Sequence, residues 1–520
     1  MTAPSPVVAS LLRPQAYPHP VERVELLETH ISWIFLTGTY AYKLKKPVNL
    51  GFLDFSTPGR REHFCREELR LNRRLSGDLY DDVIPLHGPP QRASFCGDGP
   101  VIDHAVRMRQ FPQCALLPAV LARGELGDAL IDQLADDLAR FQAEAAVAPL
   151  GGPRGTAEAV RAPVLANFAA LERCPQLAGQ AGTPARLARL RHWAEGEWER
   201  LRGRFGERLA QGWVREGHGD LHLGNLVLHQ GRIVPFDCLE FSAGLRWIDG
   251  ISEIAFLVMD LQEHGQPRLG QRLLNRWLEQ SGDWGGMDLW RWYTCYRALV
   301  RAKVAALQAD GALHTYVELA ERLIARGSPL LAITTGVSGL GKSRCSLAVA
   351  ERLGWIRLRS DVERKRAFGL WGIPQRAQRL GDPYAPAVRE ELFGERLPAL
   401  ADQLIRAGFP VVVDATFLRR TDRRRMALLA AALGAVFLIL APQGGPAVAR
   451  ARIRQRRLSG GDPSDADEGV LERQLMAAEP LGADEVACSL ALEADLDPGE
   501  LAARVRVWCG EHGVVGRGEG

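Results

Sequence analysis

The sequence has no long hydrophobic run, no strong excess of either charge and no internal repeat. A membrane span needs ~20 apolar residues, so we expect no membrane partner. The first residues lack the basic start and apolar centre of a secretory signal, so no cleaved leader is expected. A net charge of +3 over 520 residues is not typical of a nucleic-acid-binding protein, and no nucleic-acid partner is expected.

Paired cysteine motifs are also lacking, because the nine cysteines are scattered and include no Cys-x-x-Cys. Disulfide frameworks and zinc sites require such pairing, and free thiols are typical of a reducing compartment. We therefore expect a cytoplasmic protein. What is present is an ordinary globular balance, with 46% hydrophobic and 24% charged residues. At ~100–200 residues per domain, this length predicts two or three domains.

The pattern along the chain changes several times, from short strands to helices and then to alternating strands and helices. Alternation of short apolar strands with helices predicts a parallel sheet covered on both faces. The sequence ARGSP at 325–329 is predicted to be a linker. The predicted parts are an N-terminal arm (1–23), a small lobe (about 24–112), a helical lobe (about 113–325), a P-loop domain (326–510) and a disordered tail (511–520).

The stretch HGDLHLGN at 218–225 predicts a first phosphotransfer site. Asp220 and Asn225 have the five-residue separation that the catalytic Asp and the metal-binding Asn have in protein kinases. A carboxylate can accept a hydroxyl proton, and an amide oxygen beside it can bind Mg²⁺. A hairpin, LVL and RIVPF around the turn HQG, is predicted to return Asp237 to Asn225 as a second metal ligand.

A lysine–glutamate pair is expected in the small lobe. The segment YAYK places Lys43 two residues after an alanine on a strand, which matches the pattern of the ATP-binding lysine in kinases. Lys45 points to the same face of that strand, so periodicity alone leaves both lysines open. On the following helix Glu68 lies on the apolar stripe, and Glu67 does so less well.

These motifs resemble those of the aminoglycoside phosphotransferase family over residues ~24–320. The resemblance implies a kinase-like two-lobed α+β fold, with Asp220 as catalytic base and Asn225 and Asp237 as Mg²⁺ ligands. It implies a structural role for His218, and an adenine-holding link at RMRQFP, 107–112. Two features depart from the family: the first strands offer only Gly38 as a phosphate cover, and the segment after Asp237 differs from that of drug-resistance enzymes.

The stretch GVSGLGKS at 336–343 predicts a second site, because it fits GxxxxGK[ST] between a strand and a helix. Backbone N–H groups of Gly336, Gly339 and Gly341 would surround a phosphate at the helix N-terminus. Lys342 is expected to reach the β- and γ-phosphates, and Ser343 to bind Mg²⁺.

Four further residues are candidates for this second site. Asp361 ends the second strand and would orient an acceptor hydroxyl, and Asp414 ends the third strand, where it would bind Mg²⁺. In ARARIRQRRLSGGDPSDAD, Arg452 and Arg456 share one helix face and would neutralise the transferring phosphoryl group. A solvated basic helix remains the alternative interpretation of these arginines.

Residues ~328–500 resemble small P-loop kinases of the gluconate kinase, chloramphenicol phosphotransferase and zeta-toxin type. The shared features are the P-loop, the Asp after the second strand, DATF after the third, and a mobile lid at 449–467 whose arginines and SDA are similar to the lid pattern of these kinases. This resemblance implies an α/β, AAA-like ATP-binding domain with a five-stranded parallel sheet. The combination of both halves resembles a family of bifunctional aminoglycoside phosphotransferase-like and ATP-binding proteins.

We therefore expect two ATP- and Mg²⁺-dependent phosphotransferase domains that act on small-molecule hydroxyls. The sequence indicates neither the acceptor nor the oligomeric state. In one alternative only the P-loop domain is active and the first domain is a binding or regulatory lobe. In another, non-enzymatic alternative, the protein is a nucleotide-dependent sensor that presents a surface to a partner.

Overall fold

The chain separates by its contacts into two compact units in the computed structural model, which describes residues 5–51, 53–174, 182–308, 312–373, 379–459, 464–493 and 495–514. Unit 1 comprises Met1–Leu134, Glu144–Val160 and Arg204–Glu253. Unit 2 comprises Ala135–Ala143, Arg161–Gly203 and Ile254–Gly520. The predicted boundary near residue 325 does not coincide with this division, because most of the helical lobe groups with the C-terminal sheet.

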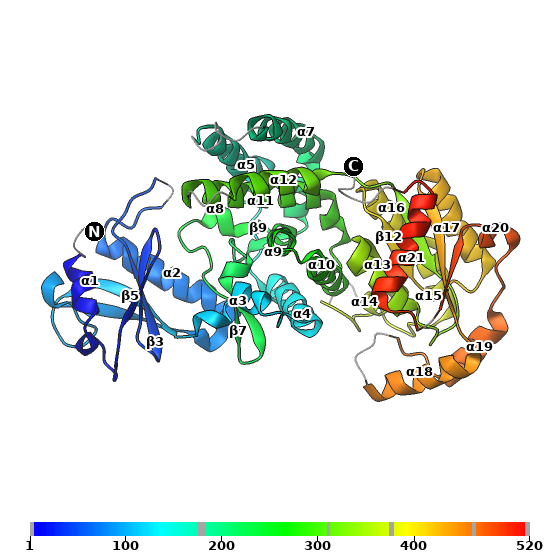
Figure 1. Ribbon diagram of the computed structural model, residues 1–520, viewed down its shortest axis with the longest axis horizontal. Helices are drawn as coiled ribbons and strands as arrows, with labels where there is room; N and C mark the ends of the chain where they lie inside the picture. Colours follow the sequence, from blue (N-terminus) through cyan, green and yellow to red (C-terminus); the bar gives the residue numbers. More distant parts are fainter. Residues whose placement is uncertain are drawn as a thin grey trace. The chain divides into compact units, whose positions relative to one another are not determined.

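Unit 1 begins with a five-stranded antiparallel sheet of order β1-β2-β3-β5-β4. Its strands are β1 (Glu25–Glu28), β2 (Ser32–Leu36), β3 (Tyr40–Lys45), β4 (Tyr80–His87) and β5 (Val101–Arg109). Helix α2 (Pro58–Ser76) packs against β4 and β5 (Figure 1). Because side chains alternate along a strand, Lys43 and Lys45 share one face of β3 and Tyr42 and Leu44 the other.

The N-terminal segment is a packed part of this lobe from residue 5 onward. Helix α1 (Pro6–Leu11) buries Val8 and Leu11 against the sheet. Tyr17 is also buried, with its ring centroid 5.0 Å from that of Tyr42. Burial of these apolar side chains offsets the entropy of ordering the segment, so the predicted arm is held against the sheet.

The predicted hairpin after the HGDLHLGN motif is confirmed. Strands β7 (Leu226–His229) and β8 (Arg232–Pro235) pair antiparallel. Their two-residue turn, Gln230 and Gly231, has positive φ at both positions, 49° and 77°, as a tight hairpin turn requires. A short pair, β6 (Val214–Glu216) with β9 (Trp247–Asp249), flanks the motif.

The helical pattern predicted for residues 113–325 is present. Its helices of ten or more residues are α4 (Asp128–Glu144), α5 (Ala157–Glu172), α7 (Thr183–Ala210), α9 (Gly250–Glu263), α10 (Pro267–Ser281), α11 (Trp290–Gln308) and α12 (Leu313–Ile324). Helices α11 and α12 pack closely against each other (Figure 1). Within the described residues, no helix is long and apolar enough to cross a membrane.

Unit 2 contains the predicted five-stranded parallel sheet, which is confirmed with the order β11-β12-β10-β13-β14. Its strands are β10 (Leu330–Thr334), β11 (Ile356–Arg359), β12 (Val411–Asp414), β13 (Val436–Gln443) and β14 (Ser489–Glu493). Every residue of β10, β11 and β12 is buried, because helices cover both faces. In such sheets, ligands bind at the carboxyl ends of the strands.

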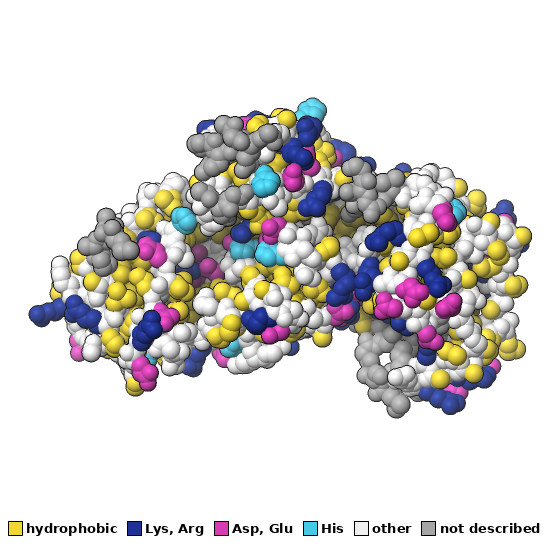
Figure 2. All heavy atoms as spheres, viewed as in Figure 1, with side chains coloured by type: hydrophobic (Ala, Val, Ile, Leu, Met, Phe, Trp, Pro, Cys, Tyr) yellow, Lys and Arg dark blue, Asp and Glu magenta, His cyan; other side chains and the backbone are white. Residues whose placement is uncertain are grey.

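Several helices surround this sheet. They are α13 (Lys342–Leu353), α14 (Ser360–Ala367), α15 (Pro386–Glu391), α16 (Leu397–Arg406), α17 (Arg420–Ala432), α18 (Pro446–Ser459), α19 (Glu468–Ala477), α20 (Ala483–Val486) and α21 (Pro498–Glu511). Helix α13 packs on α21, and α16 packs on α17 (Figure 1). Helix α21 ends one residue inside the predicted tail, and residues 515–520 lie outside the described residues. On the face drawn in Figure 2, acidic and basic side chains are interspersed with apolar ones.

The edge strand β11 is covered by helix α10, which precedes the predicted linker in the sequence. Gln271 and Asn275 of α10 each donate a side-chain hydrogen bond to the carbonyl oxygen of Trp355, at 2.9 and 3.1 Å. The Asn275 side-chain oxygen accepts from the backbone N–H of Arg357, at 2.8 Å. An uncovered edge exposes such backbone groups to pairing with other chains. Helix α10 is therefore a structural part of the C-terminal domain.

A protease cut within the predicted linker tests this arrangement. Limited proteolysis is expected to cut within 325–329, a segment without regular secondary structure. The two fragments should then co-elute in native size-exclusion chromatography, because the buried hydrogen bonds of α10 to β11 keep them together. Separation into two independently eluting folded fragments would contradict the role of α10 as an edge cover.

Candidate phosphotransfer sites

The first candidate site is built on the tight loop that begins at Gly217. The Glu253 carboxylate accepts hydrogen bonds from the backbone N–H groups of His218 and Gly219. A Cβ at Gly217 would lie 2.5 Å from that carboxylate, so only glycine allows the close approach. The buried His218 ring is 2.8 Å from the Phe236 carbonyl oxygen, and burial lowers its pKa. His218 therefore ties the loop to the segment that directly follows β8.

Asp220 and Asn225 lie side by side in this loop. The Asn225 amide nitrogen donates to the Asp220 carbonyl oxygen at 2.9 Å and to its carboxylate at 3.1 Å. The backbone N–H of Phe236 donates to the backbone carbonyl oxygen of Asn225 at 3.0 Å. Asp237 directly follows Phe236, so this hydrogen bond holds Asp237 near Asn225. Asp237 has a left-handed φ of 62°. The structure thus brings together the three residues that the motif and hairpin predicted.

Two lysines and three carboxylates form a network beside Asp237. Lys43 donates to Glu68 at 2.8 Å and also to Asp237. Lys45 donates to the other oxygen of Glu68 at 2.7 Å and also to Glu240. Glu68 therefore bridges both lysines, and the network joins β3, α2 and the segment that follows β8.

The charges of this network stabilise one another, because Lys43, Lys45, Glu68 and Glu240 are buried and only Asp237 is partly exposed. Burial by itself lowers the pKa of Lys43, but Asp237 and Glu68 outweigh it and hold that pKa well above its ordinary value. Burial raises the pKa of Glu68, yet the two lysines lower it to about 2. Burial also keeps the pKa of Glu240 above its ordinary value despite Lys45. Loss of one partner would leave a buried charge unpaired, which is costly.

The geometry distinguishes the alternatives that the sequence left open. Lys43 contacts Asp237, the predicted metal ligand, whereas Lys45 has no exposed surface and contacts Glu240 instead. Glu67 forms ion pairs with Arg70 and Arg246 rather than with either lysine. The arrangement therefore favours Lys43 and Glu68 as the pair next to the nucleotide.

The predicted nucleotide cover contains Gly38 in the turn between β2 and β3. Gly38 has a φ of 93°, and its N–H donates to the Gln110 side chain at 2.7 Å. Gln110 belongs to the segment 107–112, which was predicted to hold adenine. Phe111 of the same segment packs edge-to-face on Phe236, with centroids 5.3 Å apart. The link between strand β5 and the helical lobe is thus tied to both the cover and the metal-ligand segment.

The second candidate site is the P-loop between β10 and α13. Gly336, Gly339 and Gly341 all have positive φ, between 87° and 122°. A Cβ at Gly339 would lie 2.4 Å from the carbonyl oxygen of Ala449, so the loop requires glycine there. Lys342 is the first residue of α13, and its ammonium donates to the Val337 carbonyl oxygen at 2.8 Å. Positive potential at this helix N-terminus favours phosphate binding.

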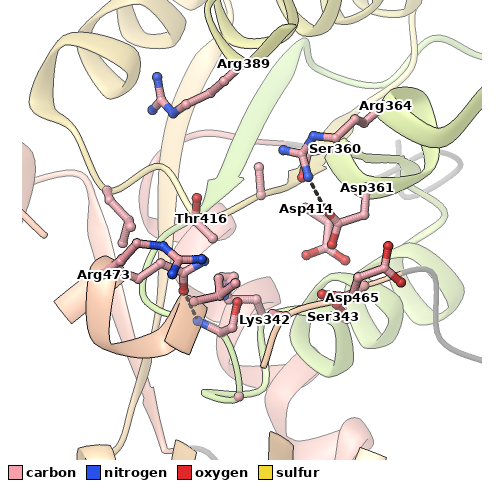
Figure 3. A pocket seen from close by; sticks show the side chains of 18 of the residues that line it. Lys342, Ser343, Ser360, Asp361, Arg364, Arg389, Asp414, Thr416, Asp465 and Arg473 are labelled. Atoms are coloured by element: carbon pink, nitrogen blue, oxygen red, sulfur yellow. Dashed lines mark hydrogen bonds and ion pairs between the residues drawn. The ribbon is translucent and has the colours of Figure 1, made fainter. Parts of the chain in front are cut away.

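A cavity of about 900 Å³ opens beside this loop (Figure 3). Seven predicted site residues line it: Gly339, Gly341, Lys342, Ser343, Asp361, Asp414 and Arg452. Arg452 also forms an ion pair with Asp495. Gly336 shapes the loop but is not among the lining residues, and the side chain of Arg456 lies outside the described residues.

Two carboxylates reach the cavity from the ends of neighbouring strands. Asp361, in the first turn of α14, accepts a hydrogen bond from Arg364 at 2.8 Å (Figure 3). Asp414 ends β12 and accepts from the Ser346 hydroxyl and from Arg357, each at 2.9 Å. Burial raises the pKa of Asp414, but Arg357 and other nearby cations outweigh burial and lower that pKa. Asp414 is therefore held as an anion.

Several cationic residues of this cavity were not singled out from the sequence. Arg473 points into the cavity from α19 (Figure 3), and Arg364, Arg389 and Arg419 also line it. The predictions concentrated on the arginine run of α18, where charge is densest. In that run, the exposed Arg454 pairs with Glu468 at 2.6 Å, as the solvated-helix alternative describes. The sequence feature that could have indicated α19 as a source of cavity residues is its position directly after the SDA motif.

A lid helix also contacts the P-loop directly. The side-chain oxygen of Gln474, on α19, accepts from the backbone N–H of Ser338 at 2.7 Å. Leu471 of α19 is buried with Val337 and Leu340 of the loop. Helix α19, which follows the predicted lid segment 449–467, therefore packs on the phosphate-binding loop.

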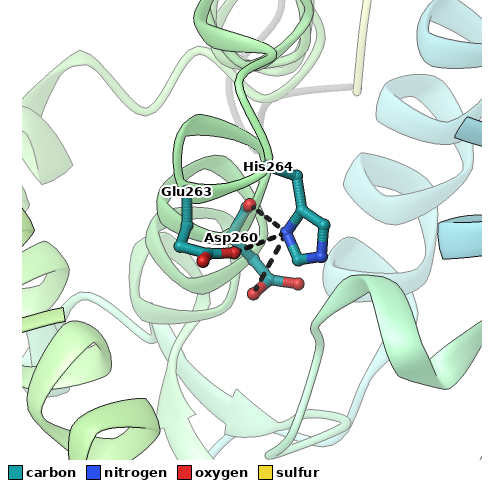
Figure 4. Close-up of side chains that lie close together, drawn as sticks. All are labelled: Asp260, Glu263 and His264. Carbon is teal, nitrogen blue, oxygen red and sulfur yellow. Dashed lines mark hydrogen bonds and ion pairs between the residues drawn. The ribbon is translucent and has the colours of Figure 1, made fainter. Parts of the chain in front are cut away.

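A third cluster, Asp260, Glu263 and His264, lies at the end of α9 (Figure 4). The His264 ring nitrogen lies 2.9 Å from both the Asp260 carbonyl oxygen and the Glu263 carboxylate. A histidine at a helix C-terminus interacts favourably with the last carbonyl groups. We therefore interpret this cluster as a helix end, and it takes no part in either site.

Comparison with known proteins identifies relatives over two thirds of the chain and a family that matches its C-terminal part. The AAA domain family matches residues 331–481, so the predicted P-loop domain is confirmed. The uncharacterized protein Rv2004c of Mycobacterium tuberculosis is 31% identical over 381 residues, which cover 67% of this chain and 70% of that protein. The uncharacterized protein Mb2027c of Mycobacterium bovis matches with the same values.

Similar folds also occur among solved structures. A gluconokinase from Sinorhizobium meliloti is 21% identical, with a TM-score of 0.26, and covers 36% of this chain and 95% of that chain. A choline/ethanolamine kinase family protein from Mesorhizobium loti is 12% identical, with a TM-score of 0.35. The match covers 61% of this chain and 90% of that chain. A thermostable mutant of the aminoglycoside phosphotransferase APH(4)-Ia is 12% identical, with a TM-score of 0.35. The match covers 59% of this chain and 94% of that chain.

Proposed function

The chain belongs to the family of the mycobacterial protein Rv2004c, and we propose that it is an ATP-dependent phosphotransferase. The observation that carries this proposal is the composition of the P-loop cavity. Lys342 and Ser343 at the N-terminus of α13 line the same cavity as Asp361. In this proposal, the loop and Lys342 bind the phosphates, and Asp361 accepts the proton of an acceptor hydroxyl.

Mg²⁺ fits the oxygen donors on this wall of the cavity. The Ser343 hydroxyl and the anionic Asp414 carboxylate both line it, and hard oxygen ligands are those that Mg²⁺ prefers. The bound ion would offset the negative charge of the phosphates. Arg452 and Arg473 would stabilise the charge of the transferring group, as cationic lid residues do in other phosphotransferases.

The acceptor in this proposal is a small hydroxyl compound that carries a carboxylate or phosphate group. Seven basic and three acidic side chains line the cavity, and Arg389, Arg419 and Arg452 also pair with carboxylates outside its lining. Arg364 lies beside Asp361 (Figure 3), and Arg389 and Arg419 also line the cavity. The Arg389 guanidinium stacks over Phe393, 4.7 Å from the ring centroid, which orients it. Arginine at such positions suits carboxylate and phosphate recognition.

Transfer from labelled ATP by the purified full-length protein tests this proposal. Hydroxy acids and sugar phosphates are expected to be phosphorylated faster than neutral alcohols of similar size. Arg389→Gln should raise the acceptor KM by about tenfold, because a charged hydrogen bond is lost, and should leave the KM for ATP nearly unchanged. Arg454→Gln, at an exposed ion pair outside the cavity, is the matched control. Equal use of neutral and anionic acceptors would contradict the assigned class.

The HGDLHLGN site is, in the same proposal, a second phosphotransfer site. Asp220 would act as the base, Asn225 and Asp237 would bind Mg²⁺, and Lys43 held by Glu68 would bind ATP. Support comes from the formed Lys43–Glu68 pair at 2.8 Å and the adjacent Asp237. All nine cysteines are free, which suits the cytoplasm, where ATP is available. If the site lacks transfer activity, the first domain is a binding lobe or a nucleotide sensor.

A further inference from the structure

A buried cluster of four charges lies between helix α10 and the P-loop domain. Glu279 of α10 faces two arginines of the edge strand, Arg357 and Arg359, and these arginines face Asp414 of β12. All four side chains are at most one-tenth exposed. Two cations and two anions thus alternate from α10 to the carboxylate that the proposed function assigns to Mg²⁺.

The contacts of Arg357 show how the cluster joins the P-loop. Its guanidinium donates to Asp414 at 2.9 Å, to the Ser346 hydroxyl at 2.9 Å and to the Ser343 carbonyl oxygen at 3.3 Å. The same group lies 3.5 Å from the Glu279 carboxylate. Arg359 lies 3.7 Å from Asp414 and 3.5 Å from the second oxygen of Glu279. Each arginine is therefore shared between the two carboxylates.

The consequence follows from the charge balance. Without Glu279, both buried guanidinium groups would lose a carboxylate that they share, and the positive charge beside Asp414 would be less well compensated. That charge would repel a cation and draw the Asp414 oxygens toward the arginines. Coulomb interactions between buried groups are screened weakly, so the effect reaches the site even without direct contact of Glu279.

We propose that Glu279 is a positioning residue of the P-loop site, which sets the cation affinity of Asp414 through Arg357 and Arg359. This inference rests on the proposed function, since it assumes that Asp414 serves a Mg²⁺·ATP site. It assigns to α10 a role beyond covering the sheet edge. A helix that precedes the P-loop domain in the sequence supplies one of the charges that this domain's site requires.

The position of Glu279 depends on a well-anchored helix. Arg268 and Arg272, earlier on α10, pair with Glu351 of α13 at 3.0 and 2.6 Å. Together with the Gln271 and Asn275 hydrogen bonds to β11, these pairs hold α10 in register with the P-loop helix. Glu351 joins α13 to α10 through Arg268 and Arg272 rather than through Arg357 or Arg359. It therefore offers a matched control for a purely structural effect.

The test measures binding of a fluorescent ATP analogue to the full-length protein during Mg²⁺ titration. Only the part of the binding that is lost in a parallel Lys342→Ala variant is counted, because that part belongs to the P-loop site. Glu279→Gln keeps the side-chain size and removes the charge. It is expected to raise the Mg²⁺ concentration for half-maximal binding by about tenfold. Glu351→Gln should change this concentration less than about twofold, although it weakens the helix contact.

The double variant Glu279→Gln with Arg359→Gln separates charge balance from loss of packing. It removes one buried cation together with the Glu279 anion and so restores the charge balance of the cluster, and its Mg²⁺ requirement should return to within about twofold of the wild-type value. A purely structural role would make the two losses add. An unchanged Mg²⁺ requirement in folded Glu279→Gln protein, or no recovery in the double variant, would overturn the inference while leaving the proposed function intact. Absence of Lys342-dependent binding in the wild type would overturn both.

Discussion

Asp220→Asn is expected to lower phosphoryl transfer at the HGDLHLGN site by about 10²–10⁴-fold, the usual contribution of a positioned base. Asparagine keeps the size of the side chain and can retain the hydrogen bond with Asn225, but it cannot accept the acceptor proton. Binding of ATP and Mg²⁺ at this site should therefore change little. Full-length protein that carries Lys342→Ala is the right background, because it isolates this site from the P-loop.

Asp237→Ala serves as the contrasting variant in the same background. It should weaken Mg²⁺-dependent ATP binding itself, because it removes a proposed metal ligand and also a carboxylate that contacts Lys43. Asp78→Asn is the control, since Asp78 is mostly exposed and belongs to neither site. Calorimetric titration with ATP, with and without Mg²⁺, separates the variants. Transfer by Asp220→Asn at the wild-type rate would show that Asp220 is not the base.

Lys342→Ala should lower transfer at the P-loop site by about 10²–10³-fold, in the range for loss of one charged or hydrogen-bonding group that stabilises the transition state. Its ammonium lies at the start of α13, within the phosphate-binding loop. Alanine leaves the loop backbone and its three positive-φ glycines unchanged, so the fold should persist. Transfer to the P-loop acceptor, measured with the Asp220→Asn variant as background, reports this loss.

The nucleotide affinity of the first site is the second readout for Lys342→Ala, and it should remain near the wild-type value. Lys303→Ala is the matched control, because Lys303 pairs with Asn167 in the helical region and does not line the cavity. Equal loss of nucleotide binding at both sites would mean that the chain contains a single ATP site. That outcome would contradict the proposal of two phosphotransfer sites.

Motifs whose chemistry depends on neighbours in the sequence were predictable. The hairpin followed from the turn HQG between apolar runs, and the structure places it at Leu226–Pro235 with His229 paired in the strand. The parallel sheet followed from short apolar strands, because strands covered on both faces are apolar throughout. Asp361 and Asp414 were predicted to end the second and third strands because each follows an apolar run, and both line the cavity.

Local patterns could not predict contacts between distant charged side chains. Lys43 and Lys45 fit the same strand periodicity, and their different partners, Asp237 and Glu240, are about two hundred residues away in the sequence. The arginine run of α18 drew attention by its density, yet Arg389 and Arg473 reach the cavity from α15 and α19. Side-chain direction into a cavity depends on how helices pack, which composition does not encode.

The sequence by itself determined the element types and the two motifs, because these follow from local periodicity and turn chemistry, whereas β11 ends at Arg359 and the predicted strand end Asp361 lies in α14. Only the tertiary structure decided which charged side chains form ion pairs with one another. It placed α10 over the edge of β11, although the linker at 325–329 suggested a boundary after that helix. A linker marks where the backbone lacks regular structure. Buried polar groups need partners, and these can come from any part of the chain that the fold brings close. Here Glu279 and Asn275, which precede the linker, are the partners of the Arg357 side chain and backbone N–H.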